Sequence, residues 1–161
     1  MAAEEAAAAA ARAEAEAEAQ RLADEAAAEA AKPTPAFYIN CGGDYYADEE
    51  RVWEKDRNFS GGRAWAPSKS NGLTDLYYDL RYGDFTYSFD VKNGSYNVGL
   101  YFSENYWNRA GGRSFDVSIN GATELSNFDV FSEAGGSFNP TARFFPVEVT
   151  DGVINIATHG N

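Results

Sequence analysis

Apolar and polar residues alternate along two stretches in the middle of the chain. Residues 96–102 place bulky apolar side chains at every second position, and residues 115–120 repeat this pattern with polar partners. A period of two predicts strands that turn one face to a core and the other to solvent. The adjacent aromatic residues Tyr106 and Trp107 fall on a predicted loop between these strands. Large flat apolar groups beyond the reach of a core indicate a surface that contacts a ligand or partner.

Short apolar runs separated by Gly, Asn, Asp and Pro continue the pattern from residue 37 onward. No helical stretch interrupts them, which favours an all-β fold, an antiparallel β-sandwich of jelly-roll type. The region from residue 46 to 73 is predicted to be a long loop that carries Trp53 and Trp65, and loops of that length are usually functional. The predicted strands cover residues 37–40, 76–82, 85–91, 96–103, 114–120, 123–125, 144–150 and 153–157.

Residues 2–31 consist almost wholly of Ala, Glu, Arg, Gln and Asp, with Leu22 as the lone large aliphatic residue. Ala and Glu favour helix, and the first helix breakers are Pro33 and Pro35, so a helix of roughly 25–28 residues is predicted. It has no apolar heptad for a coiled coil. Either it is a solvated tail, linker or engineered spacer, or it docks its Ala-rich stripe on a protein partner. The predicted domains are a helix at 1–32, a Pro-containing linker at 33–36 and a β-domain at 37–161.

The charge of the chain disfavours several classes of partner. The net charge is −12, of which residues 1–32 carry −5 and the remainder −7. An acidic surface repels phosphate backbones, so no nucleic acid is expected, and anionic membranes are disfavoured for the same reason. No apolar run approaches the ~20 residues of a membrane-spanning helix. The N-terminal segment lacks the apolar core of a secretion signal, and localisation stays open.

The residue types give little support to enzyme chemistry. His159 is the only histidine, so neither a Ser-His-Asp triad nor a histidine metal cluster is expected. Cys41 is the only cysteine and has no basic neighbour in sequence to favour a thiolate. The acids at 48–50 are consecutive, so their side chains point in different directions and predict a solvated loop more than a calcium site. No spacing selects a carboxylate pair for glycoside hydrolysis. The prediction is a non-catalytic protein without cofactor or metal.

A series of short motifs follows in order through residues 37–157. They are Tyr38-Ile-Asn-Cys-Gly-Gly43, Trp53-Glu-Lys-Asp56, Phe59-Ser-Gly-Gly62, Leu76-Tyr77, Arg81-Tyr82-Gly83, Asn93-Gly-Ser-Tyr96, Leu100-Tyr-Phe-Ser-Glu104, Gly112-Arg-Ser-Phe-Asp-Val117, Asn127-Phe-Asp129 and Val149-Thr-Asp-Gly152. In this order the region resembles the malectin family. The resemblance implies a jelly-roll β-sandwich and lectin-like, non-catalytic binding of glucose-containing oligosaccharides. It also implies that the chain stops short of the family's last strand.

The resemblance further implies where a sugar would bind. In malectin the sugar lies against aromatic residues on loops at one end of the sandwich, and the matching motifs place Tyr82, Tyr106 and Trp107 there, with Trp65 in a neighbouring loop. Aromatic rings cover the apolar face of a pyranose, while its hydroxyls need polar partners. Glu104 is the predicted polar contact, and binding loop amides is its alternative role. The acidic ligand near the end of the malectin domain has no counterpart here.

Each predicted contact also has a structural alternative. Tyr106 and Trp107 could anchor their loop, and Tyr82 could fill a corner of the sandwich. Trp53 is predicted to lie in the core. At the level of function, the alternative to a carbohydrate-binding module is a protein-interaction or structural module with the same fold and no sugar binding, as part of a larger protein or assembly. Three polar residues are expected to tie loops together: Arg113, Asp116 and Asp129.

Overall fold

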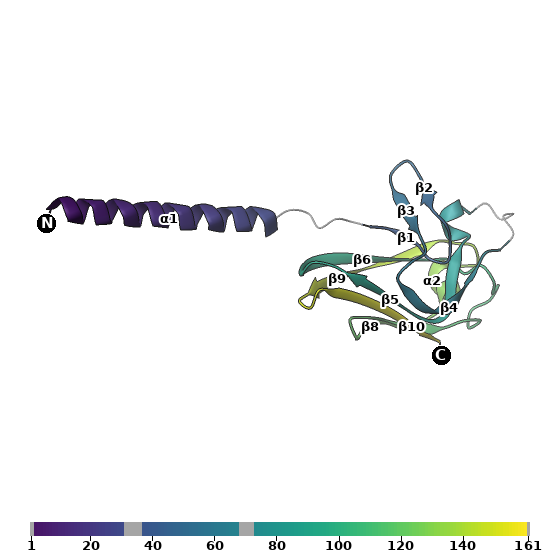
Figure 1. Ribbon diagram of the computed structural model, residues 1–161. Coiled ribbons are helices and arrows are strands. Elements are labelled where there is room, and N and C mark those ends of the chain that lie inside the picture. Colours follow the sequence, from purple (N-terminus) through teal and green to yellow (C-terminus); the bar gives the residue numbers. More distant parts are fainter. Residues whose placement is uncertain (1, 31–36, 68–72, 161) are drawn as a thin grey trace. The chain divides into compact units, whose positions relative to one another are not determined.

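The chain divides into two units, Met1–Pro35 and Ala36–Asn161. The computed structural model describes residues 2–30, 37–67 and 73–160. In the first unit, α1 (Ala2–Ala30) is a single helix of 29 residues, which confirms the predicted N-terminal helix (Figure 1). The side chains of residues 11–25 are all exposed. The predicted linker at 33–36 lies outside the described residues.

The second unit is built from short strands, as Figure 1 shows. The strands are β1 (Ile39–Asn40), β2 (Tyr46–Ala47), β3 (Val52–Lys55), β4 (Phe59–Trp65), β5 (Leu80–Asp90), β6 (Gly94–Phe102), β7 (Phe115–Ile119), β8 (Ala122–Phe128), β9 (Thr141–Val149) and β10 (Val153–Gly160), with the short helices η1 (Asp75–Tyr77) and α2 (Val130–Ala134). They form a five-stranded sheet in the order β4-β5-β10-β7-β8, a pair β6-β9 and a small sheet β1-β3-β2.

The main core lies between the five-stranded sheet and the β6-β9 pair. Its buried centre is Ile119 on β7, Val149 on β9 and Ile154 on β10. All pairings within the five-stranded sheet and the β6-β9 pair are antiparallel. In the small sheet, β1 pairs with β3 in parallel. The predicted antiparallel β-sandwich is therefore confirmed. The predicted core position of Trp53 also agrees with the structure, because this residue is buried between the rings of Tyr38 and Tyr101.

Three local predictions were wrong. The predicted long loop at 46–73 contains β2, β3 and β4. The predicted strands at 76–82 and 85–91 are replaced by η1 and one continuous strand, β5. The prediction of an all-strand domain overlooked α2. Asp129 caps this helix at its N-terminus, and Gly135, whose backbone is in the left-handed region, caps its C-terminus.

A bulge in the β4-β5 ladder explains why β5 is continuous. The register shifts between Gly61 and Arg63 on β4, and Gly61, Gly62 and Gly83 all have positive φ. Glycine adopts these angles without steric cost, so the ladder absorbs an irregularity that would otherwise end the strand. In the sequence, Gly83 and Asp84 look like a turn, because the same conformational freedom makes glycine common in turns.

A buried ion pair joins the end of β3 to β5. Arg81 Nη2 lies 2.6 Å from Asp56 Oδ2, with side-chain exposures of 6% and 9%. The Tyr87 hydroxyl donates to the other carboxylate oxygen of Asp56 at 2.6 Å. Desolvation raises the pKa of Tyr87, and the neighbouring Cys41 and Asp56 raise it further, so its hydroxyl stays a donor. This network fixes the start of β5 relative to the small sheet.

Candidate functional site

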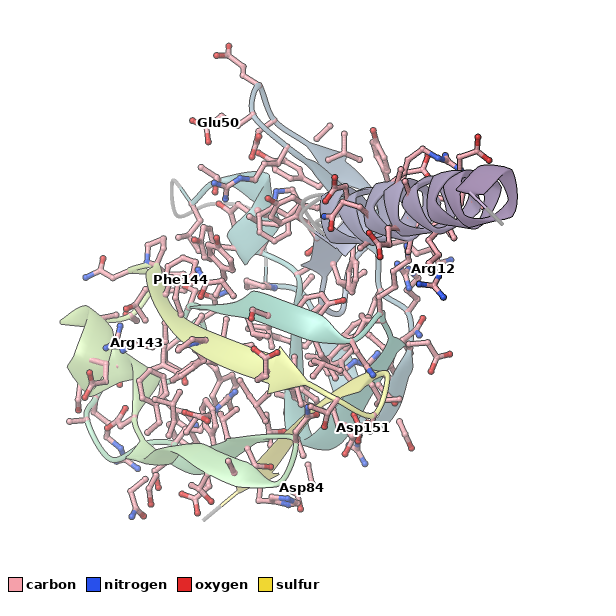
Figure 2. All side chains as sticks on the ribbon, turned by 90° about the vertical axis from the view of Figure 1, so that its left-hand side faces the viewer. Arg12, Glu50, Asp84, Arg143, Phe144 and Asp151 are labelled. Atoms are coloured by element: carbon pink, nitrogen blue, oxygen red, sulfur yellow. The ribbon has the colours of Figure 1, made fainter. Side chains whose placement is uncertain are left out.

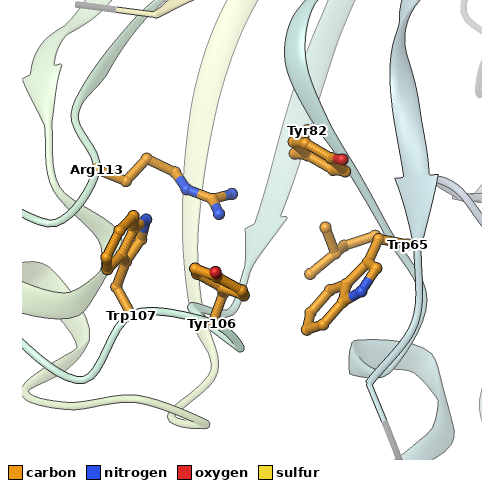
Figure 3. A pocket seen from close by; sticks show the side chains of 6 residues that line it. Trp65, Tyr82, Tyr106, Trp107 and Arg113 are labelled. Carbon is orange, nitrogen blue, oxygen red and sulfur yellow. The ribbon is translucent and has the colours of Figure 1, made fainter.

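An open pocket of about 330 Å³ lies where β4 ends and β5 begins. Its lining side chains come from three segments: the end of β4, the start of β5 and the loop at 103–114 that joins β6 to β7 (Figure 3). Most of them carry aromatic rings. They are Trp65, Leu80, Tyr82, Tyr106, Trp107 and Arg113.

The β4-β5 ladder supplies one wall of the pocket. Trp65 is the last residue of β4 and pairs with Leu80, while Arg63 pairs with Tyr82. Residues two apart on a strand share a face, so Trp65, Leu80 and Tyr82 face the same side of the sheet. Trp65 therefore lies on a strand, not in the loop where the sequence pattern had put it, and its backbone is part of the β4-β5 ladder.

The loop at 103–114 supplies the opposite wall. The Tyr106 side chain is 66% exposed, and its ring lies edge-on to Trp107, with ring centroids 5.0 Å apart. Its other neighbour is Trp65, whose centroid is 6.1 Å away at an interplanar angle of 78°. These contacts join β4 to the loop and form a row of three rings beside the cavity, which Figure 3 shows. Trp107 is half-buried, so it both packs and lines the pocket.

Glu104 holds this loop in shape. Its carboxylate is only 3% exposed, and Oε1 accepts hydrogen bonds from the backbone N–H of Tyr106 at 2.9 Å and of Trp107 at 3.0 Å. Its other oxygen lies 3.3 Å from Nε of Arg113. Glu104 is not among the pocket-lining residues, so the geometry favours the alternative role considered above, binding loop amides.

The far end of the loop is tied to α2. Asp129 accepts a hydrogen bond from the Gly111 N–H at 2.6 Å and also caps α2 through Phe131 and Ser132. Desolvation acts to raise the pKa of Asp129, but the hydrogen bonds from Gly111, Ser132 and Phe131 together lower it below its usual value of 3.8. The next residue, Gly112, packs against Trp107, since a Cβ there would lie 2.7 Å from Cβ and Cγ of the indole side chain.

The structure brings four of the five predicted site residues around one cavity. Trp65, Tyr82, Tyr106 and Trp107 line it, and Glu104 supports the loop beneath. Two lining residues were missed by the sequence reasoning. Leu80 looked like ordinary strand sequence, and Arg113 was expected only to tie loops together, because an arginine after two glycines carries no signal of where its side chain points.

Other candidate residues have structural positions. The acids at 48–50 are exposed, Glu50 lies at the tip of the β2-β3 hairpin (Figure 2), and Asp48 accepts from the N–H groups of Glu50 and Arg51. Asp116 accepts from the Asn127 N–H at 2.7 Å and so ties β7 to β8. Within the described residues, no group of three His, Cys, Asp or Glu side chains is arranged to hold a metal ion.

Cys41 is not set up as a nucleophile. The residue as a whole is exposed, but desolvation of its sulfur raises the pKa of the thiol to about 11, and the interaction with Tyr87 and the charge of Arg81 offset this only in part. At neutral pH the sulfur is therefore protonated, and the thiolate that reacts as a nucleophile is scarce.

This β-sandwich is a carbohydrate-binding type of fold. The malectin domain matches residues 36–161, and the chain belongs to the malectin domain family.

The curated relatives are longer proteins. The chain is 27% identical over 138 residues to a probable leucine-rich repeat receptor-like serine/threonine-protein kinase from Arabidopsis thaliana, a match that covers 76% of this chain and 14% of the kinase. It is 26% identical over 84 residues to Malectin-B from Xenopus laevis, which covers 50% of this chain and 30% of Malectin-B. The chain thus spans less than a third of the length of these relatives.

Solved structures share the fold. The ANXUR2 extracellular domain from Arabidopsis thaliana matches with a TM-score of 0.70 at 22% identity, covering 78% of this chain and 43% of that one. A β-glucuronidase from Bacteroides uniformis matches with a TM-score of 0.67 at 21% identity, covering 78% and 16%. At these identities the likeness concerns the fold alone. No helix in the described part of the chain is both long and apolar enough to span a membrane.

Proposed function

We propose that this domain is a non-catalytic carbohydrate-binding module that recognises glucose-containing oligosaccharides in the aromatic pocket. The observation that carries the proposal is the exposure of Tyr106 beside a cavity of about 330 Å³. An exposed tyrosine ring normally gains stability by packing, so a ring held open next to a hollow is available to a ligand. The cavity volume falls within the roughly 300–1,000 Å³ typical of small-molecule sites.

The lining residues suit a sugar ring. Tyr106, Trp107 and Trp65 offer rigid apolar surfaces for the C–H face of a pyranose. The hydroxyl of Tyr82 and the guanidinium of Arg113 supply hydrogen-bond partners at the other side of the cavity. Glu104 contributes by holding the loop that carries the two adjacent rings, and we assign it a positioning role. Binding here requires no proton transfer and no bond cleavage.

The test is titration of the protein with maltose and other glucose disaccharides, followed by calorimetry and tryptophan fluorescence. Binding in the micromolar to millimolar range is expected, with a change in the emission of Trp107 and Trp65 as the rings lose contact with water. Failure to bind any saccharide at millimolar concentration would reject the proposal and favour a protein-interaction module on the same fold.

Replacement of the exposed rings gives a sharper result. Tyr106→Ala and Trp107→Ala are each expected to weaken binding by about 1–3 kcal/mol, judging from truncation of aromatic anchors at interfaces. Tyr45→Ala is the matched control for Tyr106→Ala, because Tyr45 is 65% exposed and does not line the pocket. It is expected to leave affinity unchanged. Equal affinities for Tyr106→Ala, Tyr45→Ala and the unchanged protein, all folded, would place the sugar elsewhere.

A further inference from the structure

Arg113 is the one charged side chain among the six that line the pocket. Figure 3 shows it reaching from the Trp107 side toward the middle of the cavity. The side chain is 30% exposed, and its Nε lies 3.3 Å from Oε2 of Glu104. Its guanidinium carbon also lies 5.8 Å from the ring centroid of Tyr82. No hydrogen bond joins Nη1 or Nη2 to another described residue, so both terminal nitrogens are available to a ligand.

Glu104 orients the guanidinium of Arg113 and leaves other N–H donors of this group for a ligand. One carboxylate oxygen is already shared by two backbone N–H groups, and Nε of Arg113 lies 3.3 Å from the other. A guanidinium has five N–H donors in a fixed planar arrangement, and the terminal nitrogens match the two oxygens of a carboxylate. Because this ion pair orients the guanidinium, its terminal donors are preorganised for a ligand that brings a pair of acceptor oxygens.

The charge around the pocket differs from the net charge of the whole protein. Arg109, which is exposed, lies 5.3 Å from the ring of Trp107, and no ion pair joins it to another described residue. Arg113 faces one buried carboxylate, that of Glu104, and none of the lining residues is acidic. In a chain of net charge −12, a cavity lined by one arginine and by no acid, with Arg109 against one of its lining rings, is less acidic than the protein as a whole.

We propose that the preferred ligand carries a carboxylate, as a uronic acid residue does. Its carboxylate accepts hydrogen bonds from Nη1 and Nη2 of Arg113 while its ring lies against the aromatic wall. This inference rests on the proposed function and names the class of sugar. A neutral hydroxyl would also accept from Arg113, but hydrogen bonds between two charged groups are about twice as strong.

The experiment compares three ligands that differ at one carbon. They are maltose, the same disaccharide with C6 of its non-reducing glucose oxidised to a carboxylate, and the methyl ester of that acid. We expect the acid to bind at least about tenfold more tightly than the other two at low salt, and the preference to shrink as salt is added. The ester has nearly the shape of the acid without its charge and is expected to bind like maltose.

Variants assign the preference to one residue. Arg113→Gln is expected to bring the acid and maltose to within about twofold of each other. Because that change leaves Glu104 buried without its partner, the double variant Arg113→Gln, Glu104→Gln repeats the measurement with a neutral pair. The control is Arg143→Gln, since Arg143 is 32% exposed, pairs with Glu133 and does not line the pocket. Tryptophan fluorescence checks that each variant is folded.

The possible outcomes are distinct. Binding of maltose as tight as that of the acid overturns this inference and leaves the proposed function intact. Binding of neither overturns both. An acid preference that survives in folded Arg113→Gln and in the double variant overturns the assignment to Arg113, whereas its loss in those variants and its retention in Arg143→Gln support it.

Discussion

Single residues decide how the pocket is shaped. Trp107 occupies its place because the residue beneath it has no side chain: a Cβ at Gly112 would lie 2.7 Å from two atoms of the tryptophan. Real Cβ atoms do not come this close to such neighbours, so the indole and Gly112 are matched to each other. The aromatic wall therefore depends on a glycine that touches no ligand.

Gly112→Ala should move Trp107 and weaken binding. We expect a loss of sugar affinity of about 1–3 kcal/mol, similar to that for Trp107→Ala, with a shift in tryptophan emission. Gly111→Ala is the control. Gly111 has φ of 71° and open space at its Cβ, so that change strains the backbone at a cost of about 1 kcal/mol in stability without touching the indole. Unchanged affinity in Gly112→Ala would show that the position of Trp107 does not matter for binding.

Asp129 ties the loop at 103–114 to α2, and its ionisation makes this connection sensitive to acid. Its pKa is lowered below 3.8 because its hydrogen bonds outweigh desolvation, so the folded state prefers the ionised form. Its contribution to stability is present above pH 3.8 and is lost as the pH falls through this value toward the lower pKa of the folded state.

Asp129→Asn should make the free energy of unfolding depend less on pH at acidic pH. Asparagine still caps a helix well, so the loss of stability at neutral pH is expected to be below about 1 kcal/mol, and the drop below about pH 4 should be shallower. Urea unfolding between pH 3 and 7 measures both. Asp151→Asn is the control, because Asp151 is exposed and lies in the turn between β9 and β10. A curve for Asp129→Asn that is parallel to that of the unchanged protein would contradict the prediction.

The sequence indicated which aromatic residues lie outside the core, but it gave much less information about where individual side chains point. Tyr106 and Trp107 could be found because they follow an alternating strand, where no core is available. Arg113 could not be identified as a pocket residue from the sequence. Its position depends on the ion pair with Glu104 and on the hydrogen bond from the Gly111 N–H to Asp129. Those contacts join residues 9 and 18 positions apart and leave no periodic pattern.

At the scale of elements, period-two alternation located the strands that pack on the core. β6, β7, β9 and β10 all lie within two or three residues of their predicted bounds, since each has one apolar face. β4 was missed because it consists of Phe-Ser-Gly-Gly-Arg-Ala-Trp, in which two glycines suggest a loop. The β4-β5 ladder uses these glycines in a bulge, and the wall that carries Trp65 and Tyr82 depends on it. α2 was missed because five residues are too few to show a helical period.

The buried network at the start of β5 predicts that loss of the Asp56 carboxylate strongly lowers the free energy of unfolding. Asp56→Ala would leave Arg81 buried without its partner, at an expected cost of about 3–5 kcal/mol in the free energy of unfolding. Tyr87→Phe removes only the hydroxyl and should cost about 1.5–3 kcal/mol. The measurement is urea unfolding at pH 7.

An exposed ion pair nearby provides the control. Glu54 and Arg57 lie 2.8 Å apart with side-chain exposures of 44% and 40%, so solvent screens their attraction. Glu54→Ala is expected to cost less than about 1 kcal/mol. If Asp56→Ala cost no more than Glu54→Ala, the buried pair would not be what holds β3 against β5.

At the scale of the whole molecule, the composition of the chain changes once. The change from Ala and Glu to short apolar runs occurs near the prolines at 33 and 35, and the two units meet between Pro35 and Ala36. The malectin domain match begins at the same residue, 36. The helix itself is sustained by intrinsic propensity and by pairs such as Arg21 with Glu18 and Glu25, since its described side chains are exposed.

Removal of residues 1–35 tests whether the helix contributes to the pocket. All six lining residues and the core belong to Ala36–Asn161, so we expect the shortened chain to keep its sugar affinity within about twofold at 0.15 M salt and to unfold at the same urea concentration. At low salt an acidic ligand should bind it slightly more tightly, because removal of the segment reduces the net charge of the protein from −12 to −7. A fall in the urea midpoint or a tenfold loss of affinity would instead show that the helix packs on the β-domain, and a solvated spacer would no longer describe it.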